Sequence, residues 1–415
     1  MSTLRLYTAL LSSLLLAACA STLDPQQVPA PVVAAQPAVT NEPAIAQAPP
    51  MPPPPPARPD VVAPTAPAAT APAWSNPKQG RALLNRLMPA KIKDRAGWSN
   101  DIFAAFEALR IPYTAEYFCA ATSVIEQESS WEADPVVPGL GKMVWKQIEL
   151  KADEKGIPMP LVSAALKAKS SNGQSFRSRI DKLRTEREMN LLYEEMSAEA
   201  ESFGVSLSSQ NPVRTGGPMQ VSIDFATSHA RAWPYPYPVR ESMRREVFTR
   251  RGGVYFGIAN LLHYQAPYDT LFFRFADYNA GRYSSRNAAF QAAVAKLSKR
   301  KIDLDGDLLR YSTGRPSKQA SSTLQAIRPL ADKLKLSPAE IERDLLLEKT
   351  SNFGQSPLYQ RLFALADKVG NKPLPRAISP QIRLSSPKIT RKLTTEWFAK
   401  RVDWRYQRCL ARVAS

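Results

Sequence analysis

Histidine and cysteine are scarce in this chain, and their scarcity narrows the chemistry that it can perform. The 415 residues include two histidines, His229 and His263, and three cysteines. The histidines share no metal-ligand spacing with the cysteines, and His263 lies in an apolar helical pattern. We therefore expect structural histidines, no metal site and no cofactor.

Two further kinds of site find little support. No glycine-rich phosphate-binding loop appears. The acidic run at residues 303–307 hints at a calcium loop, but Gly314 stands where the twelfth loop position requires a glutamate. The run is therefore predicted to be a polar turn.

The apolar run near the N-terminus is too short to span a membrane. Arg5 precedes the mostly apolar residues 10–16, and Leu-Ala-Ala-Cys follows, ending at Cys19. These features predict a secretory signal peptide over residues 1–18. The tetrapeptide resembles the bacterial lipobox, whose cysteine carries acyl chains such as palmitate and becomes the mature N-terminus. An ordinary signal peptide with an incidental cysteine is the alternative.

By the same resemblance, the residue after the cysteine bears on localisation. Ala20 is not acidic, which favours sorting to the outer membrane. We therefore expect a lipid-anchored outer-membrane protein that faces the periplasm, with the cell surface as the alternative. Each methylene group that an acyl chain buries in the membrane contributes about 0.8 kcal/mol to binding, so several chains on one cysteine anchor the protein firmly.

Residues 19–73 have the composition of a tether. They are mostly Pro, Ala, Val, Thr and Gln, and they show no hydrophobic period. Such a segment cannot bury a core and is predicted to be disordered, with an extended reach of roughly 170 Å. It could carry the folded part to a target away from the membrane, or it could be a linker whose length has no function.

The excess of positive charge falls on the folded part. The net charge is +18, and the segment before Trp74 holds fewer basic than acidic residues. An exported protein is not expected to meet nucleic acid, so anionic cell-wall polymer or an anionic membrane surface fits this charge, as does a generally basic solvated surface.

Besides Cys19, the chain holds Cys119 and Cys409. Two cysteines in an oxidising compartment can form a disulfide. A bond between these two would hold the last predicted helix, at 392–413, against the helix predicted at 115–129.

Helical patterns dominate from residue 74 onward, and strand-like alternation is sparse. The fold class is therefore expected to be mainly α. An aromatic segment at 232–239 has proline at every second position, which predicts extended chain that packs on the domain or lines a groove. The patterns predict helices over residues 82–88, 100–109, 115–129, 162–169, 180–203, 253–265, 269–279, 287–299, 322–334, 338–347, 358–369 and 392–413.

The first of three motifs is Glu-Ser at the end of the helix predicted at 115–129. Tyr117, Ala121, Val124 and Glu128 fall on one helical face, so Glu128 continues an apolar stripe. Partial burial disfavours the charged form of a carboxyl and raises its pKa, which suits a general acid for glycosidic cleavage. Glu126 lies about 200° round the helix and is expected to face solvent. A solvated helix end is the ordinary alternative.

The second and third motifs are each ordinary when taken alone. Gly216-Gly217-Pro218-Met219-Gln220 can be a plain turn before a buried methionine, but glycine also lets backbone approach a ligand, and Gln220 offers a donor and an acceptor. Tyr278-Asn279-Ala280-Gly281 ends an amphipathic helix, where Gly281 suits the residue just past the helix end and Tyr278 can donate a hydrogen bond to the acid or the sugar.

Taken in order, the three motifs resemble those of the soluble lytic transglycosylase family, which has a lysozyme-like fold. The resemblance covers residues 118–292. It implies that Glu128 acts as acid and then as base, and that five residues line the sugar subsites: Ser129, Met219, Gln220, Tyr278 and Asn279. The implied reaction cleaves the bond between N-acetylmuramic acid and N-acetylglucosamine in peptidoglycan and closes a 1,6-anhydro ring. Asp277 and Asp134 are candidate second carboxylates, so a hydrolytic, lysozyme-type reaction stays open.

The sequence departs from the family pattern at two places. Pro218 replaces an apolar residue of the second motif, and a long insertion at about 137–211 separates the first motif from the second. We expect a lysozyme-like domain at 74–302 with a helical insertion that forms a lid, a subdomain or a block on the cleft, followed by a helical C-terminal region at 303–415. The expected partners are glycan strands and, through the anchor, a membrane; protein partners are not indicated. The alternative is a non-catalytic outer-membrane lipoprotein that binds wall or peptide in the same cleft.

Overall fold

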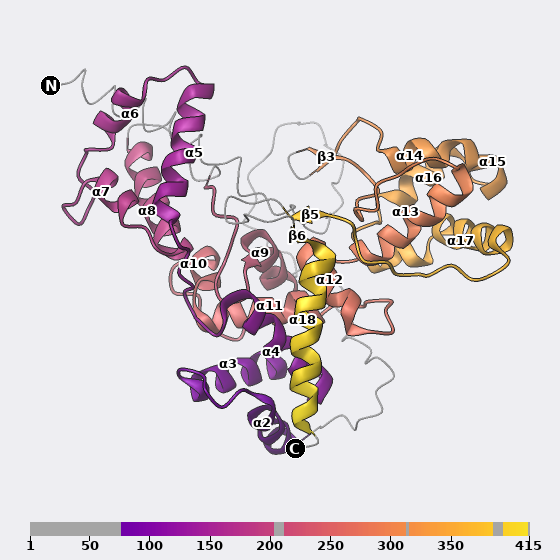
Figure 1. Ribbon diagram of the computed structural model, residues 1–415, viewed down its shortest axis with the longest axis horizontal. Helices are drawn as coiled ribbons and strands as arrows, with labels where there is room; N and C mark the ends of the chain where they lie inside the picture. The colour runs from indigo at the N-terminus through magenta and orange to yellow at the C-terminus, as the bar shows by residue number, and fades with distance from the viewer. Residues whose placement is uncertain (1–75, 203–210, 313–314, 385–392, 414–415) are drawn as a thin grey trace, which may run out of the picture.

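The computed structural model describes residues 76–202, 211–312, 315–384 and 393–413. In these ranges helices dominate, and the named strands form three short antiparallel pairs (Figure 1). The expected mainly α fold class is therefore confirmed. The predicted signal peptide, Cys19 and the tether through residue 73 lie outside the described residues.

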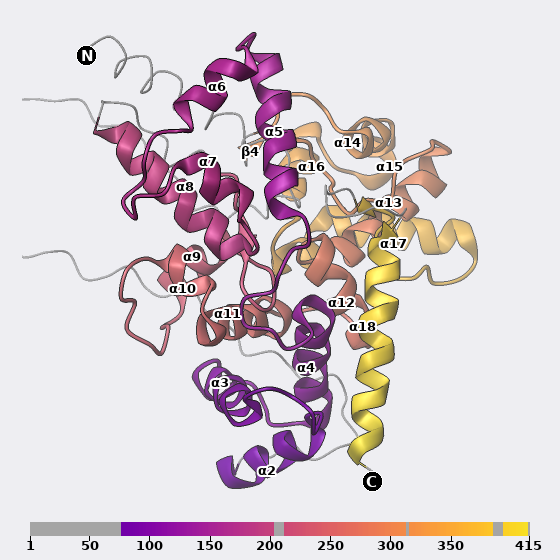
Figure 2. The ribbon, with the colours of Figure 1, turned by 60° about the vertical axis from the view of Figure 1, so that its left-hand side comes forward.

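The larger hydrophobic core is built by helices from both ends of the described chain. Its central helix, α11, buries side chains on nearly every face, which is the pattern of a helix enclosed by others. The helix α18 runs along α4 and α12, where Figures 1 and 2 show it on the outside of the molecule. The helices of this group are α2 (Pro77–Leu87), α3 (Arg95–Ala108), α4 (Ala115–Ser129), α11 (Arg250–Leu262), α12 (Leu271–Ala280) and α18 (Thr395–Leu410).

The insertion forms a helical lobe that shares this core. It consists of α5 (Leu140–Glu154), α6 (Met159–Ala165), α7 (Phe176–Asp181) and α8 (Glu186–Glu201). The single helix predicted at 180–203 is wrong, because the chain leaves α7 at Lys182 and starts α8 with a new cap. Thr185 and Glu188 form a capping box there, with Glu188 Oε2 accepting the Thr185 N–H at 3.2 Å.

A hairpin and an aromatic segment connect the insertion to α11. Strands β1 (Thr215–Gly216) and β2 (Val221–Ser222) pair around a turn, and α9 (Ile223–Ala232) and α10 (Met243–Val247) follow. The proline-rich segment between those helices packs on the domain. Trp233 Nε1 donates to the Ala108 carbonyl at 2.9 Å, and the Tyr235 ring stacks on Phe256 at 4.9 Å between centroids.

A second, smaller core occupies the lobe that lies across α12 from the insertion (Figure 1). It consists of α13 (Ser284–Ser298), β3 (Tyr311–Ser312), β4 (Arg315–Pro316), α14 (Ser322–Ile327), η3 (Arg328–Leu330), α15 (Ala331–Leu334), α16 (Pro338–Leu345), η4 (Ser351–Gln355) and α17 (Pro357–Gly370). The buried Arg286 on α13 donates to the carbonyls of Glu348 at 2.6 Å and Thr350 at 2.7 Å. These bonds tie α13 to the chain that links α16 to η4.

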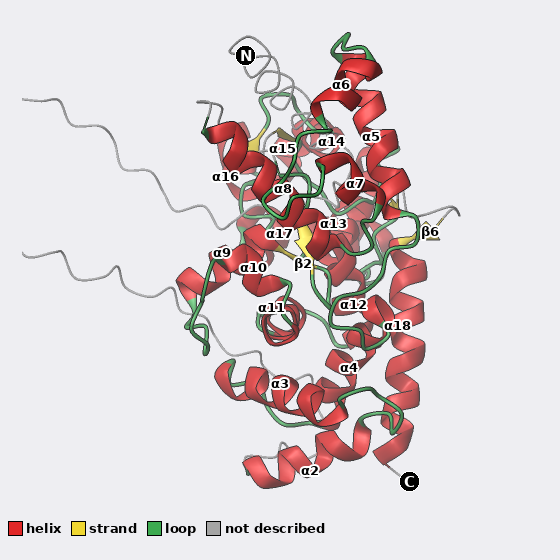
Figure 3. Cartoon of the chain, turned by 90° about the vertical axis from the view of Figure 1, so that its left-hand side faces the viewer, coloured by secondary structure: helices red, strands yellow, loops and turns green. Residues whose placement is uncertain are grey.

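The second core begins before residue 303, where the C-terminal region was expected to start. Helix α13 contributes Phe290 and Val294 to the second core, although it precedes that boundary. Strands β5 (Arg383–Leu384) and β6 (Leu393–Thr394) then lead the chain back, and α18 packs into the first core. Figure 3 shows α18 beside α4, far from the second lobe's outer helices. The last helix therefore belongs with the first motif.

A disulfide fixes this return. Cys119 on α4 is bonded to Cys409 on α18, with 5.5 Å between their Cα atoms and 290 residues between them in sequence. Both side chains are buried. The bond closes a loop that includes both the insertion and the second core.

Removing the disulfide should lower the free energy of unfolding. Because the bond restricts the unfolded chain over a very long loop, we expect Cys119→Ala/Cys409→Ala to lose about 2–5 kcal/mol. Urea unfolding of the oxidised protein and the variant measures this difference. Equal midpoints and equal slopes for the two proteins would contradict it.

Candidate functional site

The second and third motifs meet through a backbone carbonyl. The Tyr278 hydroxyl, on α12, donates to the Met219 carbonyl in the β1–β2 turn at 2.6 Å. Burial and, after it, the negative charge of Glu128 raise the pKa of Tyr278 well above its usual range. Glu128 therefore lies close enough to Tyr278 to act on it electrostatically, and all three motifs come together.

Glu128 stands in the last turn of α4. Thr114 begins this helix by accepting the Tyr117 N–H at 3.2 Å, and Ser130 and Trp131 end it in the left-handed region, with φ of 51° and 68°. Trp131 is buried edge-on against Trp98, with 5.4 Å between centroids. The turn that ends α4 is therefore anchored in the core, and it holds the half-buried Glu128 at a fixed place.

Glu126 differs from its expected position. Its side chain is half-buried rather than solvent-facing, and Oε1 lies 3.7 Å from Nε of Arg405 on α18. The helical spacing was interpreted without α18, which covers this side of α4. The two glutamates thus face different surroundings: Glu126 is covered by α18, and the charge of Glu128 acts on Tyr278.

Met219 does not line a subsite with its side chain. It is fully buried, and it packs on Gly257 of α11, where a Cβ atom would collide with the Met219 sulfur. Its contribution to the site is the carbonyl that Tyr278 binds. Pro218, the departure from the family pattern, lies against Gly253 of the same helix, so the turn packs closely on α11.

The remaining expected residues are tied to their neighbours. Ser129 is buried, and its hydroxyl donates to the Ile125 carbonyl one turn back at 3.0 Å. Asn279 is half-buried, and its Oδ1 accepts a hydrogen bond from Thr395 Oγ1 at 3.2 Å. Because Thr395 is the first residue of α18, this bond joins the third motif to the last helix.

Gln220 has a partner that sequence reasoning missed. Its backbone is left-handed, with φ of 50°, and its side-chain Nε2 donates to Oε2 of Glu186 at 2.8 Å. Glu186 is the first residue of α8, so the insertion delivers a carboxylate to the candidate site. The capping box at Thr185 and Glu188 is a sequence signal for the start of α8, but nothing local indicates that it meets Gln220.

The start of α8 is bound to the chain that leaves α4. The Val137 N–H donates to the Arg184 carbonyl at 2.7 Å, and Thr185 Oγ1 donates to Oδ2 of Asp134 at 3.1 Å. Burial raises the pKa of Asp134, and the charges of Glu186 and Glu188 add to this shift. These contacts hold the insertion against the site on the side of α4's C-terminus.

Asp277 serves the structure rather than the reacting centre. It is buried, and its oxygens accept hydrogen bonds from Tyr268 at 2.5 Å, from the Tyr283 N–H at 2.8 Å and from the Ser285 N–H at 2.7 Å. Burial raises its pKa to about 6. Asp277 thus binds the first turn of α13 to the end of α12, which leaves it poorly placed as a second catalytic carboxylate.

The histidines form a buried pair. His229 Nε2 lies 3.2 Å from His263 Nδ1, and the other ring nitrogen of each residue is buried with no hydrogen-bond partner. Burial, and after it the Arg282 charge, lowers the pKa of His229 to about 3 and that of His263 to about 4. Both rings are therefore neutral core residues. Among the described residues, no group of three or more His, Cys, Asp or Glu side chains could hold a metal ion.

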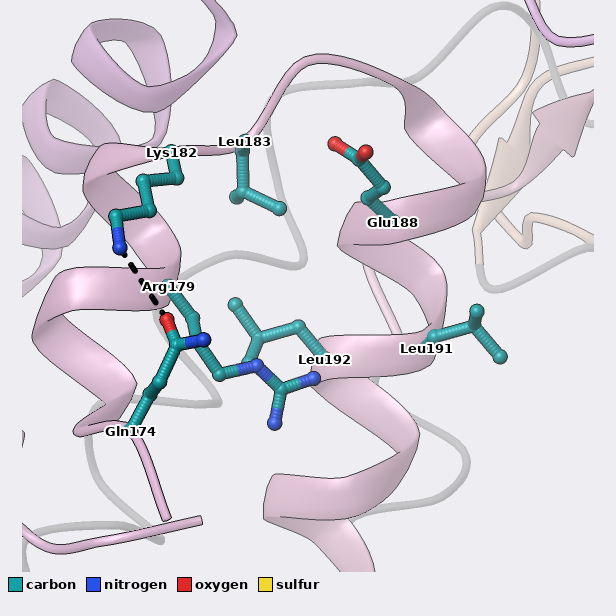
Figure 4. Close-up of a pocket in the computed structure, with 7 residues that line it drawn as sticks. All are labelled: Gln174, Arg179, Lys182, Leu183, Glu188, Leu191 and Leu192. Atoms are coloured by element: carbon teal, nitrogen blue, oxygen red, sulfur yellow. Dashed lines mark hydrogen bonds between the residues drawn. The ribbon is translucent and has the colours of Figure 1, made fainter. Parts of the chain in front are cut away.

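The insertion contains a cavity of about 210 Å³ between α7 and α8 (Figure 4). Figure 4 shows Lys182 bound to Gln174 on one wall and Glu188 on the other, with leucines between them. None of the expected site residues lines it. The lining residues are Gln174, Arg179, Lys182, Leu183, Glu188, Leu191 and Leu192.

Comparison with known proteins shows a family to which the chain belongs and a curated relative. The family model described as a protein of unknown function (DUF1615) matches residues 91–412. The uncharacterized protein YaiW from Escherichia coli (strain K12) is 46% identical over 328 residues, which cover 79% of this chain and 88% of that protein. No solved structure matches the chain significantly. Within the described ranges, every helix is too short or too polar to cross a membrane.

The histidine pair predicts how stability depends on pH. Unfolded histidines take up protons near pH 6.5, whereas the folded pair stays neutral to about pH 4. The free energy of unfolding should therefore fall as the pH drops from 6.5 toward 4. His229→Leu/His263→Leu removes both imidazoles and should remove this part of the fall. Urea unfolding at several pH values tests this, and an identical pH dependence in the variant would contradict it.

Proposed function

The chain belongs to the family described as a protein of unknown function (DUF1615), and we propose that it is a membrane-anchored peptidoglycan lytic transglycosylase. Glu128 is the acid and then the base of this reaction. The observation that carries the proposal is the convergence of three motifs on Glu128 and Tyr278, although 150 residues separate the two side chains in the sequence. The same three motifs, in the same order, carry the resemblance to the soluble lytic transglycosylases and their lysozyme-like fold.

The proposed reaction needs one carboxyl group. Glu128 protonates the oxygen that links N-acetylmuramic acid to N-acetylglucosamine, and the bond from this oxygen to C1 breaks, which leaves an oxocarbenium-like sugar. The Glu128 carboxylate then takes the proton of the C6 hydroxyl while O6 bonds to C1. The substrate supplies its own nucleophile, so neither Asp277 nor Asp134 has to act.

The neighbours of Glu128 have separate tasks in this scheme. Tyr278 keeps its proton because its pKa is raised, and it holds the β1–β2 turn through the Met219 carbonyl. Gln220 donates from Nε2 to Glu186, and its side-chain carbonyl accepts from the Thr215 hydroxyl at 3.4 Å. A carbonyl oxygen has two lone pairs, so it can also accept a hydrogen bond from a sugar hydroxyl or acetamide group. Glu186 is therefore a positioning residue, because it sets the direction of the Gln220 amide.

The proposed location follows from the N-terminal segment. Acylation of Cys19 would hold the protein at the outer membrane, and the proline-rich segment that follows would let the folded part reach glycan strands.

One observation favours the second candidate, a non-catalytic lipoprotein that binds wall or peptide. Glu186, in the first turn of α8, holds the side chain of Gln220, one of the residues expected to bind glycan.

Substitution of Glu128 should abolish the proposed activity. A positioned general acid contributes about 100-fold to 10,000-fold, so Glu128→Gln should lose at least about 100-fold in product release. Glu126→Gln is the matched control, because it makes the same chemical change two residues away, under α18. The measurement is mass spectrometry of anhydro-muropeptides released from purified sacculi.

Two results would overturn the assignment. Anhydro products at equal rates from Glu128→Gln and the parent would exclude Glu128 as the acid. Binding to sacculi without product from a well-folded parent would favour the non-catalytic candidate. Equal thermal unfolding of the two variants excludes misfolding as the cause of a loss.

Substitution of Glu186 tests whether the insertion serves the site. A hydrogen bond to a charged group contributes about 1.5–3 kcal/mol, so Glu186→Ala should lower kcat/KM by about 10-fold to 100-fold on soluble glycan strands. Glu186→Gln keeps an acceptor oxygen and should recover part of the loss. In a Gln220→Ala background the Glu186 effect should vanish, because the two residues act as one unit. Additive effects would contradict this.

A further inference from the structure

The exposed side of α18 carries a stripe of alternating tryptophan and arginine. Trp397, Arg401, Trp404 and Arg408 are spaced by four, three and four residues, so they lie along one helical face. Trp397 is 38% exposed and Trp404 is 53% exposed. We call these four residues the Trp/Arg stripe. Large exposed aromatic rings in a row are unusual on a surface that meets only water.

The stripe is held rigidly by the opposite side of the helix. Phe398, Val402 and Tyr406 are buried against the first core, and Cys409 is bonded to α4. Arg405 lies between the two sides, with its Nε 3.7 Å from Oε1 of Glu126 and its guanidinium 5.9 Å from the centre of the Trp404 ring. Among the described residues, the outer face of α18 is therefore the side of this helix that is left open to a partner.

The charge of the stripe is positive. The Arg401 guanidinium lies 5.7 Å from the centre of the Trp397 ring, and that of Arg408 lies 4.5 Å from the Trp404 ring. The acidic Glu396 on this helix is bound to Lys400 at 2.7 Å. By helical spacing, Glu396 and Asp403 lie roughly 100° from the stripe on its flank. The partner that fits is anionic and tolerates indole rings.

The C-terminal end of α18 lies at the end of the molecule where the described chain begins. Arg412, just after α18, donates to the Leu87 carbonyl at the end of α2 at 2.5 Å. Figures 1 and 2 show α2 and the C-terminus at the same end of the molecule. Residue 76, with which the described chain begins, is therefore at the same end as the last turn of α18.

We propose that the Trp/Arg stripe docks on an anionic lipid surface. Guanidinium groups bind phosphate oxygens, and tryptophan lies with its ring at the level of the headgroups, so the two residue types fit one layer. The stripe follows one helix and spans about 16 Å. Such a straight row of side chains suits a flat surface better than an extended polymer that would bind in a groove. This surface is separate from Glu128 and does not depend on the proposed reaction.

Vesicle binding of the unacylated mature chain, from residue 20, tests the proposal. Both cores and the disulfide lie within residues 83–409, so this chain keeps them all. In flotation we expect binding to phosphatidylcholine vesicles that contain phosphatidylglycerol and little binding to phosphatidylcholine alone. Each arginine near an anionic surface contributes about fivefold in affinity, so Arg401→Gln/Arg408→Gln should bind about 25-fold more weakly.

Matched controls separate the stripe from general charge and apolarity. Lys318→Gln/Lys335→Gln removes the same charge from exposed positions of the second lobe and should leave binding unchanged. Trp397→Ala/Trp404→Ala should abolish binding, whereas Leu161→Ala/Val369→Ala, at other exposed apolar positions, should not.

Two outcomes would overturn the proposal. The first is equal binding by the stripe variants and their controls. The second is absence of vesicle binding together with stripe-dependent binding to soluble glycan strands, which would assign the face to glycan instead.

Discussion

The packing of α18 along α4 and α12 is the constraint on which the rest of the structure depends. It brings residues from the end of the chain against the first and third motifs, and the Cys119–Cys409 bond fixes it. Two polar contacts then extend it to the site. Thr395 binds Asn279, and Arg405 faces Glu126. Without α18, one side of both motif-bearing helices would be exposed to water.

The three motifs meet because small residues allow close approach. Gly257 on α11 leaves room for the Met219 side chain, and this packing sets the height of the β1–β2 turn. The Met219 carbonyl is then within reach of Tyr278, whose pKa is raised by burial and by the charge of Glu128. A larger residue at 257 would push the turn away from α12. The convergence is therefore a consequence of core packing, and the polar contacts follow from it.

Sequence patterns predicted the parts of this arrangement that are local. The helix at 115–129 and the glycine that ends α12 follow from periodicity and capping. The helix α5 was missed because Gly139 before it supplies no side-chain cap. The roles of Met219 and Glu186 could not be predicted, because burial on Gly257 and contact with Gln220 depend on residues 34 or more positions away. Long-range packing decides such roles, and one sequence does not encode it in a readable pattern.

The two faces of helix α18 have different roles. The inner face fixes the proposed site, and the outer face carries the Trp/Arg stripe, about one helix diameter away. In the proposed lipid-bound state the site would lie near the membrane, and the glycan strands of the proposed reaction would lie farther from it. Two tryptophans and two arginines bind lipid weakly, and salt weakens them further. Such a contact is reversible. Together with a long segment before residue 76, this contact would let the domain bind the membrane and then dissociate to reach the wall. A deeply inserted anchor on α18 would prevent that dissociation.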